Sequence, residues 1–149
     1  SGRKAAFAKS CTGGLVAKRL TALPGASAVF DFGAVTYSNA MKAKALGIDP
    51  GLIETHGAVS EQVARAMAEG VRAFSGSDVG IGITGIAGPD GGTEEKPVGT
   101  VYIGLSDGQE TKVQLHRLGA KTRGRDMIRM FAASRAFDML RRYLEDTSE

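Results

Sequence analysis

Ala8-Lys9-Ser10-Cys11-Thr12-Gly13-Gly14, residues 8–14, is the stretch around which the rest of the chain can be arranged. A short apolar run over residues 5–8 ends there, and an amphipathic segment begins directly after the two glycines. A strand-to-helix turn of this kind exposes small side chains at the edge of a sheet and directs backbone N–H groups outward. Ser10 or Cys11 could carry chemistry here, although small residues also begin helices for purely structural reasons.

The spacing of apolar residues predicts an α/β fold. Strands are expected at about residues 5–8, 29–38, 78–86, 98–105 and 110–117, and helices at about 12–23, 39–46, 50–56, 60–75 and 122–144. Asp107-Gly108 is a strong hairpin signal, so the last two strands should be antiparallel. Helices interleaved with strands then imply a three-layer α/β/α sandwich with a mixed sheet.

Two of the expected elements have unusual faces. In the strand at 78–86, Gly80 and Gly82 alternate with branched side chains, so a helix can pack very close to its bare face. The last helix is apolar around more than half of its circumference, with stripes that include Phe131 and Phe137. Because one sheet face cannot cover both stripes, we expect a homo-oligomer, at least a dimer, with this helix or its neighbour at the interface. The alternative is that other helices of the same chain cover both stripes.

The composition is that of an ordinary globular chain. The 149 residues, 42% hydrophobic and 23% charged, fit one domain over residues 1–149. No apolar run approaches the ~20 residues of a membrane helix, no signal peptide is visible, and the one cysteine suits a reducing compartment, so we expect a cytoplasmic protein without a membrane partner. The net charge of +3 comes from scattered bases, which favours a solvated surface over nucleic-acid binding.

The turn at 8–14 offers two nucleophiles. Cys11 is intrinsically stronger but needs a base, and neither His56 nor His116 can be placed beside it; the alternative is a small buried hydrophobe. Ser10 could instead use Lys42, because a lysine in a partly desolvated pocket has a lowered pKa and can act as a general base without histidine or metal. Tyr37 could donate or relay a proton. The competing interpretation is that Lys42 is solvated on a polar helix face.

A second candidate loop, Thr84-Gly85-Ile86-Ala87-Gly88-Pro89-Asp90-Gly91-Gly92, follows an expected strand, as a ligand-cradling loop should. It is neither a Walker A loop nor a G-x-G-x-x-G motif. The only acids clustered near it are Asp90, Glu94 and Glu95, and no histidine accompanies them, so no metal site is expected.

Several segments together resemble the CinA C-terminal domain family, whose stand-alone members are nicotinamide-nucleotide amidases of the PncC type. They are Ser10-Cys11-Thr12-Gly13-Gly14, Val35-Thr36-Tyr37-Ser38-Asn39 with Lys42, and the loop at 84–92 continuing through Lys96-Pro97-Val98-Gly99-Thr100. His56-Gly57-Ala58-Val59-Ser60 fits between them. The resemblance covers nearly the whole chain.

The resemblance implies an oligomeric α/β/α sandwich that hydrolyses the carboxamide of nicotinamide mononucleotide, a small nucleotide substrate, to nicotinate mononucleotide and ammonia without a cofactor or metal. It places the nucleophile at Ser10, the base at Lys42 and the assisting tyrosine at Tyr37. Substrate-binding candidates are Thr12, Gly13, Gly14, Asn39, Thr84, Gly85, Ala87, Gly88 and Gly91, with Arg125, before the last helix, for the phosphate.

The chain departs from the family pattern in three places. Lys9 stands where the family usually has glutamate, Arg123-Gly124 replaces a small polar pair, and much of the helix that usually precedes the first strand is not seen. Lys9 reverses a charge next to the expected nucleophile. An alternative function is therefore a non-catalytic ligand-binding or partner protein that keeps the fold.

Overall fold

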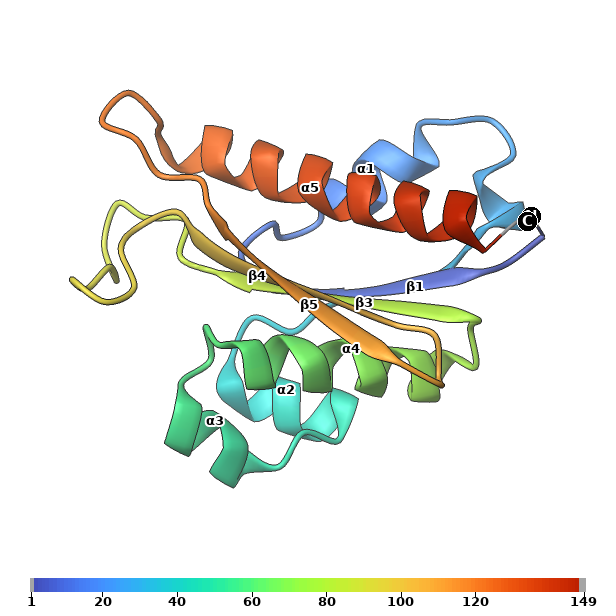
Figure 1. Ribbon diagram of the computed structural model, residues 1–149, viewed down its shortest axis with the longest axis horizontal. Helices are drawn as coiled ribbons and strands as arrows, with labels where there is room; N and C mark the ends of the chain where they lie inside the picture. The colour runs from blue at the N-terminus through green and yellow to red at the C-terminus, as the bar shows by residue number, and fades with distance from the viewer. Residues whose placement is uncertain (1, 148–149) are drawn as a thin grey trace.

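A five-stranded mixed sheet forms the middle layer of the computed structural model, which describes residues 2–147. The strands are β1 (Ala5–Lys9), β2 (Phe30–Val35), β3 (Val79–Gly85), β4 (Thr100–Ser106) and β5 (Thr111–Arg117). The helices are α1 (Leu15–Thr21), the 3-10 turn η1 (Ala26–Ala28), α2 (Asn39–Leu46), α3 (Pro50–His56), α4 (Glu61–Ser75) and α5 (Arg125–Asp146). Helices α1 and α5 cover one face and α2, α3 and α4 the other (Figure 1), which confirms the three-layer α/β/α prediction.

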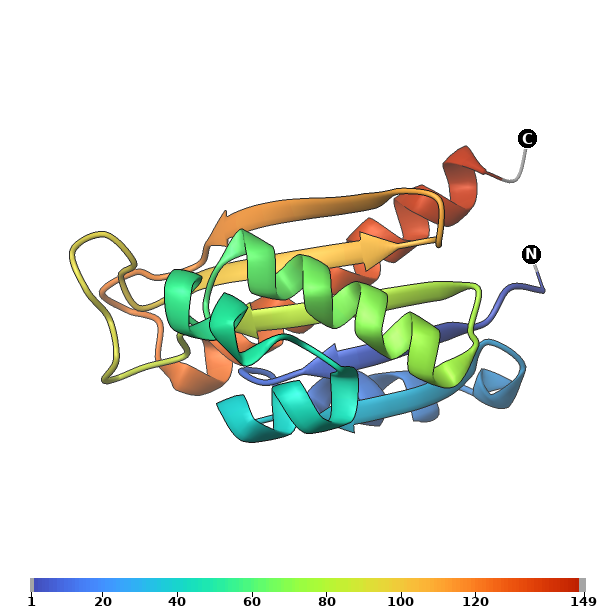
Figure 2. The same cartoon turned by 90° about the horizontal axis from the view of Figure 1, so that it is seen from below.

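The strand order β2-β1-β3-β4-β5 places β1 inside the sheet. β1 pairs in parallel with both β2 and β3, whereas β3–β4 and β4–β5 are antiparallel, as the hairpin signal predicted. The carboxyl ends of β1, β2 and β3 therefore lie at the same edge of the sheet (Figure 2). The segments that follow these strands are the turn after Lys9, the loop before α2 and the glycine-rich loop after Gly85, so these three meet at that edge.

The bare face of β3 lies against α4, as its glycines predicted. A Cβ at Gly82 would lie 2.6 Å from the backbone nitrogen of Ala68 and 2.6 Å from the Cβ of Met67. Gly104 on β4 is equally close to α4, because a Cβ there would lie 2.7 Å from the carbonyl oxygen of Ala64. The fit of α4 to the sheet thus depends on missing side chains on both strands.

The apolar face of α5 is covered mostly by its own chain. Its buried residues, Ile128, Ala132, Ala133, Ala136 and Met139, pack on the sheet. Arginines lie over three half-buried aromatic rings of its two apolar stripes: Arg123 over Phe131, Arg19 over Phe137 and Arg3 over Tyr143, at 4.6, 4.9 and 5.6 Å from the ring centroids. Met127 and Met130 are the large hydrophobic side chains that the described part of α5 leaves exposed. The homo-oligomer stays a prediction, and the exposed apolar surface of α5 that supports it is smaller than the sequence suggested.

Several predicted boundaries were wrong by a few residues. The helix expected over 12–23 spans only Leu15–Thr21, because Gly13 takes a positive φ of 58° and delays the first helical turn. The strand expected to reach Ser38 ends at Val35, and Arg125 begins the last helix rather than preceding it. No helix within residues 2–147 combines the length and the apolar character needed to cross a bilayer.

Replacing Gly82 with alanine should lower the free energy of unfolding by at least about 2 kcal/mol, because the new Cβ would overlap backbone atoms of α4. Urea denaturation followed by circular dichroism measures the loss. Gly124→Ala is the control, since a Cβ there meets no atom within 4 Å, and it should cost no more than about 1 kcal/mol. Equal losses in the two variants would contradict the close packing of α4 on β3.

Candidate functional site

A cavity of about 240 Å³ lies at the edge where β1, β2 and β3 end. It brings together most of the residues that the sequence singled out: Ser10, Tyr37, Asn39, Lys42, Thr84, Gly85, Ala87, Gly88, Gly91 and Arg125. Cys11, the alternative nucleophile, and Ile86 and Asp90 of the candidate loop also line it, together with Ala58 and Val59, which had no predicted role in the site. Ligands of open α/β sheets bind outside the carboxyl ends of parallel strands, and this cavity has that position.

The first residues after Cys11 do not reach this cavity. Thr12, Gly13 and Gly14 are absent from its lining, because the turn toward α1 carries them away from it. The side chain of Thr12 is fully buried, Gly13 backs onto the guanidinium of Arg129, and Gly14 is the exposed N-cap of α1. Their expected contact with substrate has no support in this geometry.

Ser10 directly follows β1 and is held against β3. Its backbone N–H donates to the carbonyl of Ile83 at 3.1 Å, and its hydroxyl donates to the same oxygen at 3.5 Å. The side chain is 7% exposed and lines the cavity. The hydroxyl thus borders the cavity although the residue is buried, and its one hydrogen bond within residues 2–147 is long.

Cys11 lines the same cavity but is a poor nucleophile. Burial raises the pKa of its thiol to about 11, although the positive charges of Arg129 and Lys42 oppose the shift. At neutral pH the thiol is therefore protonated, and the thiolate is the reactive form. The cavity wall is tight at this point, because a Cβ at Gly85 would lie 3.2 Å from the Cys11 sulfur.

Lys42 is buried rather than solvated. Ser38 caps α2 by accepting the N–H of Met41 at 3.2 Å, and this start places Lys42 in the first turn, facing inward with 2% exposure. Its Nζ donates to the carbonyl of Thr36 at 2.9 Å and to that of Tyr37 at 3.5 Å. Burial lowers the Lys42 pKa, with a smaller opposing effect from Cys11. No hydrogen bond joins Lys42 to Ser10, both of which lie in the described part of the chain.

Arg125 connects the two sides of the cavity. It comes from the first turn of α5, donates through Nη1 to the carbonyl of Gly88 at 2.6 Å, and donates through Nη2 to the phenol oxygen of Tyr37 at 3.0 Å. Tyr37 is 65% exposed and accepts this bond, so its own proton stays free to donate. Tyr37 and Arg125 therefore span the cavity from different layers of the fold.

The wall at Ala58 and Val59 is fixed by two long-range hydrogen bonds. Thr84 donates its hydroxyl to the carbonyl of Ala58 at 2.7 Å, and Lys96 donates its amine to the carbonyl of Val59 at 2.6 Å. Lys96 also reaches the carbonyl of His56 at 3.2 Å. The sequence did carry a signal for this wall, because residues 56–60 formed part of the resemblance without any assigned role.

Lys9 does not line the cavity, although it precedes Ser10. Its side chain is 1% exposed, and a Cβ at Gly33 would lie 2.9 Å from both the Lys9 amine and the ring of Phe30. Phe30 packs against the core between the sheet and α5. Burial lowers the pKa of Lys9. The Lys9 amine thus lies beside Gly33 of β2, and its positive charge does not face the candidate site.

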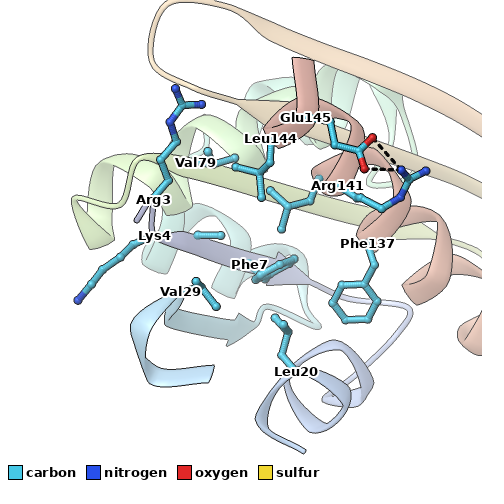
Figure 3. Close-up of a pocket in the computed structure, with 12 residues that line it drawn as sticks. Arg3, Lys4, Phe7, Leu20, Val29, Val79, Phe137, Arg141, Leu144 and Glu145 are labelled. Carbon is cyan, nitrogen blue, oxygen red and sulfur yellow. Dashed lines mark hydrogen bonds and ion pairs between the residues drawn. The ribbon is translucent and has the colours of Figure 1, made fainter. Parts of the chain in front are cut away.

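A larger cavity of about 600 Å³ lies at the opposite end of β1, between the beginnings of the parallel strands and the last turns of α5 (Figure 3). Its wall is mostly apolar and includes Phe7, Leu20 and Phe137. The charged Arg141 and Glu145 are bonded to each other at 2.8 Å. Its size does not by itself indicate a reaction site, and none of the described residues that line it is a serine, threonine, cysteine or histidine. Within residues 2–147, no group of three His, Cys, Asp or Glu side chains could hold a metal ion.

Comparison with known sequences identifies similar proteins along nearly the whole chain. Residues 1–144 match the family model of the CinA C-terminal domain. A CinA-like protein of Desulfovibrio desulfuricans is 52% identical over 142 residues, which are 95% of this chain and 33% of that protein. A CinA-like protein of Acidobacterium capsulatum is 52% identical over 143 residues, or 96% and 34% of the two chains. The chain spans about a third of the length of these curated relatives.

Solved structures have the same fold. The competence/damage inducible protein CihA from Agrobacterium tumefaciens superimposes with a TM-score of 0.89 at 41% identity, over 93% of this chain and 84% of that chain. The competence damage-inducible protein A from Klebsiella pneumoniae gives a TM-score of 0.92 at 30% identity, over 99% and 89%. The mixed sheet and its helix layers are therefore shared with structures of this kind.

Lys9→Met should raise the free energy of unfolding at neutral pH by about 1–2 kcal/mol, because it removes a buried amine that makes no hydrogen bond within residues 2–147. The unfolded chain binds the Lys9 proton more tightly than the folded one, so the amine costs most below its folded pKa. That cost falls as the pH rises toward 10.5, and the advantage of methionine should shrink with it. Denaturation at pH 7 and pH 10 checks this, with the exposed Lys18→Met as control. An equal gain at both pH values would contradict the argument.

Proposed function

The chain belongs to the CinA C-terminal domain family, and we propose that this domain hydrolyses the carboxamide of nicotinamide mononucleotide to nicotinate mononucleotide and ammonia. The supporting observation is the cavity in which Ser10 and the buried amine of Lys42 meet Tyr37 and Arg125. The proposal concerns this domain alone, because the curated relatives are about three times as long.

The first half of the proposed reaction forms an ester on Ser10. The Ser10 oxygen attacks the carboxamide carbon while its proton passes to the neutral amine of Lys42. Both groups are now held by backbone carbonyls, those of Ile83 and Thr36, so the serine hydroxyl must turn from Ile83 toward Lys42 when substrate binds. The tetrahedral intermediate then breaks its C–N bond, and the amide nitrogen takes a proton from the Lys42 ammonium and leaves as ammonia.

The second half releases the acid. Lys42, neutral again, takes a proton from a water molecule that attacks the ester carbon, and the Ser10 oxygen leaves with a proton. An oxyanion forms in both halves, and an N–H donor that reaches it typically contributes about 3 kcal/mol. The N–H groups of Gly13 and Leu15 do not serve this purpose, because they donate to the carbonyls of Ser10 and Thr12. Tyr37, whose proton is free, is placed to assist the proton transfers from the cavity mouth.

Arg125 is the proposed contact for the phosphate of the substrate. A guanidinium carries five N–H donors, and the bonds to Gly88 and Tyr37 use only two of them. Arg125 is exposed whereas Ser10 is buried, so a nucleotide could bind with its carboxamide inward and its phosphate outward. The missing side chain at Gly91, where a Cβ would lie 3.7 Å from Ile86, leaves room for the ribose.

Ser10→Ala should lower ammonia release from nicotinamide mononucleotide by at least about 1000-fold, because it removes the nucleophile. Cys11→Ala is the matched control in the same cavity, and it should keep most of the turnover because its thiol is protonated at neutral pH. An enzyme-coupled ammonia assay measures both variants. Full turnover in Ser10→Ala with loss in Cys11→Ala would reverse the assignment, and tight binding without turnover in the wild type would favour a non-catalytic ligand-binding protein.

Turnover should rise with pH through the lowered pKa of Lys42 and then level off. Only the neutral amine accepts the serine proton, so each pH unit below that pKa should lower kcat about tenfold. Lys42→Arg should lose the activity, because a guanidinium stays protonated. A kcat profile between pH 6 and pH 10, with chemistry shown to be rate-limiting, tests this. A flat profile would contradict Lys42 as the base, and a chelator should change nothing because the proposed reaction uses no metal.

A further inference from the structure

Arg129 lies one helical turn after Arg125 on α5, yet it reaches a different part of the site. Its Nη2 donates to the carbonyl oxygen of Thr12 at 3.1 Å, within the turn that follows Ser10. Arg129 does not line the 240 Å³ cavity, so it acts from behind the turn. Arg125 in the first helical turn of α5 thus contacts residues at the mouth of the cavity. Arg129, one helical turn later, contacts the segment after Ser10 from the side away from the cavity.

The guanidinium of Arg129 packs directly against the backbone of the turn. A Cβ at Gly13 would lie 2.8 Å from Nη2, so the arginine takes the space that any other residue would fill, and Gly13 also needs its positive φ of 58°. The Thr12 carbonyl already accepts the N–H of Leu15 at 3.2 Å. Because the N-cap of α1 is Gly14 and gives no side-chain bond, Arg129 supplies a side-chain anchor for the start of this helix.

The charge of Arg129 is directed into the protein. Its one ion pair with a described residue is with Asp126, at 3.7 Å, and the Asp126 side chain is 99% exposed, so solvent screens that partner. The Nε atom is buried with no hydrogen-bond partner within residues 2–147. Arg129 and Lys42 are the cations that lower the pKa of Cys11 against the effect of burial. The positive potential of Arg129 is therefore felt at the residue next to Ser10.

We propose that Arg129 is a positioning residue for the Ser10 turn: it fixes the Thr12 carbonyl and Gly13, and so holds Ser10 and the neighbouring N–H groups in the orientation that the reaction needs. This role rests on the proposed amidase function. A misplacement of about 1 Å in a reacting group costs about 100-fold in rate, so a buried anchor behind the turn is as consequential as a contact in front of it.

Arg129→Gln and Arg129→Lys test the proposal, with the exposed Arg135→Gln on the same helix as control. Arg129→Gln should lower kcat about 100-fold and change KM less than about threefold, because the turn is disordered while the substrate contacts remain. Arg129→Lys should lose part of kcat, since an ammonium cannot reproduce the planar contact with Thr12 and Gly13. Arg135→Gln should match the wild type. A rise in KM alone, or a kcat equal to that of Arg135→Gln, would overturn the proposal.

Alkylation of Cys11 gives a readout that does not depend on turnover. Cys11 is the one cysteine of the chain, and iodoacetamide reacts with its thiolate, so the rate against pH reports the thiol pKa. In Arg129→Gln the midpoint of the pH profile, taken relative to each variant's own plateau rate, should shift to higher pH, whereas Arg129→Lys keeps the charge and the profile. Lys42 also faces Cys11 and is unchanged in all these variants.

The two assays separate the two proposals. A wild-type chain that releases no ammonia would end the amidase function, and an alkylation profile in Arg129→Gln equal to that of Arg135→Gln would then overturn the role of Arg129 independently. If Arg129→Gln does not fold, Arg129→Lys decides: a kcat reduced at least about tenfold supports the positioning role, and an unchanged kcat overturns it.

Discussion

The parallel pairing of β1 with both of its neighbours is the constraint on which the rest of the structure depends. Because β2, β1 and β3 run in one direction, three connections that lie far apart in the sequence end at one edge of the sheet. They are the turn at Ser10, the loop that leads to Lys42, and the glycine-rich loop after Gly85. An antiparallel β1–β3 pair would place the last of these at the far end of the molecule. The antiparallel strands β4 and β5 extend the sheet and its core, and β5 ends at this same edge, from which the chain continues to Arg125 at the start of α5.

The sequence was most informative where local chemistry decides the outcome. Glycines at alternate positions predicted the close approach of α4 to β3, and Asp107-Gly108 predicted the hairpin. The helix expected at about 60–75 is α4, and Ser60 caps its start by accepting the Val63 N–H at 3.2 Å. The resemblance located most of the cavity lining. Helix boundaries near Gly13 could not be predicted, because the positive φ there is set by packing against Arg129, a residue over one hundred positions away. Tertiary partners of that kind leave no periodic signal.

The same limit explains what was missed in the candidate site. The inward direction of Lys42 depends on carbonyls that are exposed to it only because β2 ends at Val35. The distance of Lys9 from the cavity depends on the side of β1 to which its side chain is directed, against Gly33. Lys42 and Lys9 are both almost inaccessible to solvent, but only Lys42 lines the cavity, beside Ser10 and Cys11. Lys9 instead fills the space next to Gly33 in the edge strand β2.

The hydrogen bonds of Arg125 connect the two helix layers of the fold at the mouth of the cavity. Arg125 belongs to α5 on one side of the sheet, whereas Tyr37 belongs to the connection into α2, which packs on the other side. Local opening of a helix at lower free energy than global unfolding is common in folded proteins. Separation of the first turn of α5 would break the bonds to Gly88 and Tyr37 and dismantle the mouth while the sheet remained intact. The competence of the site and the docking of the last helix therefore form one cooperative unit, whose local stability can be lower than that of the core beneath it.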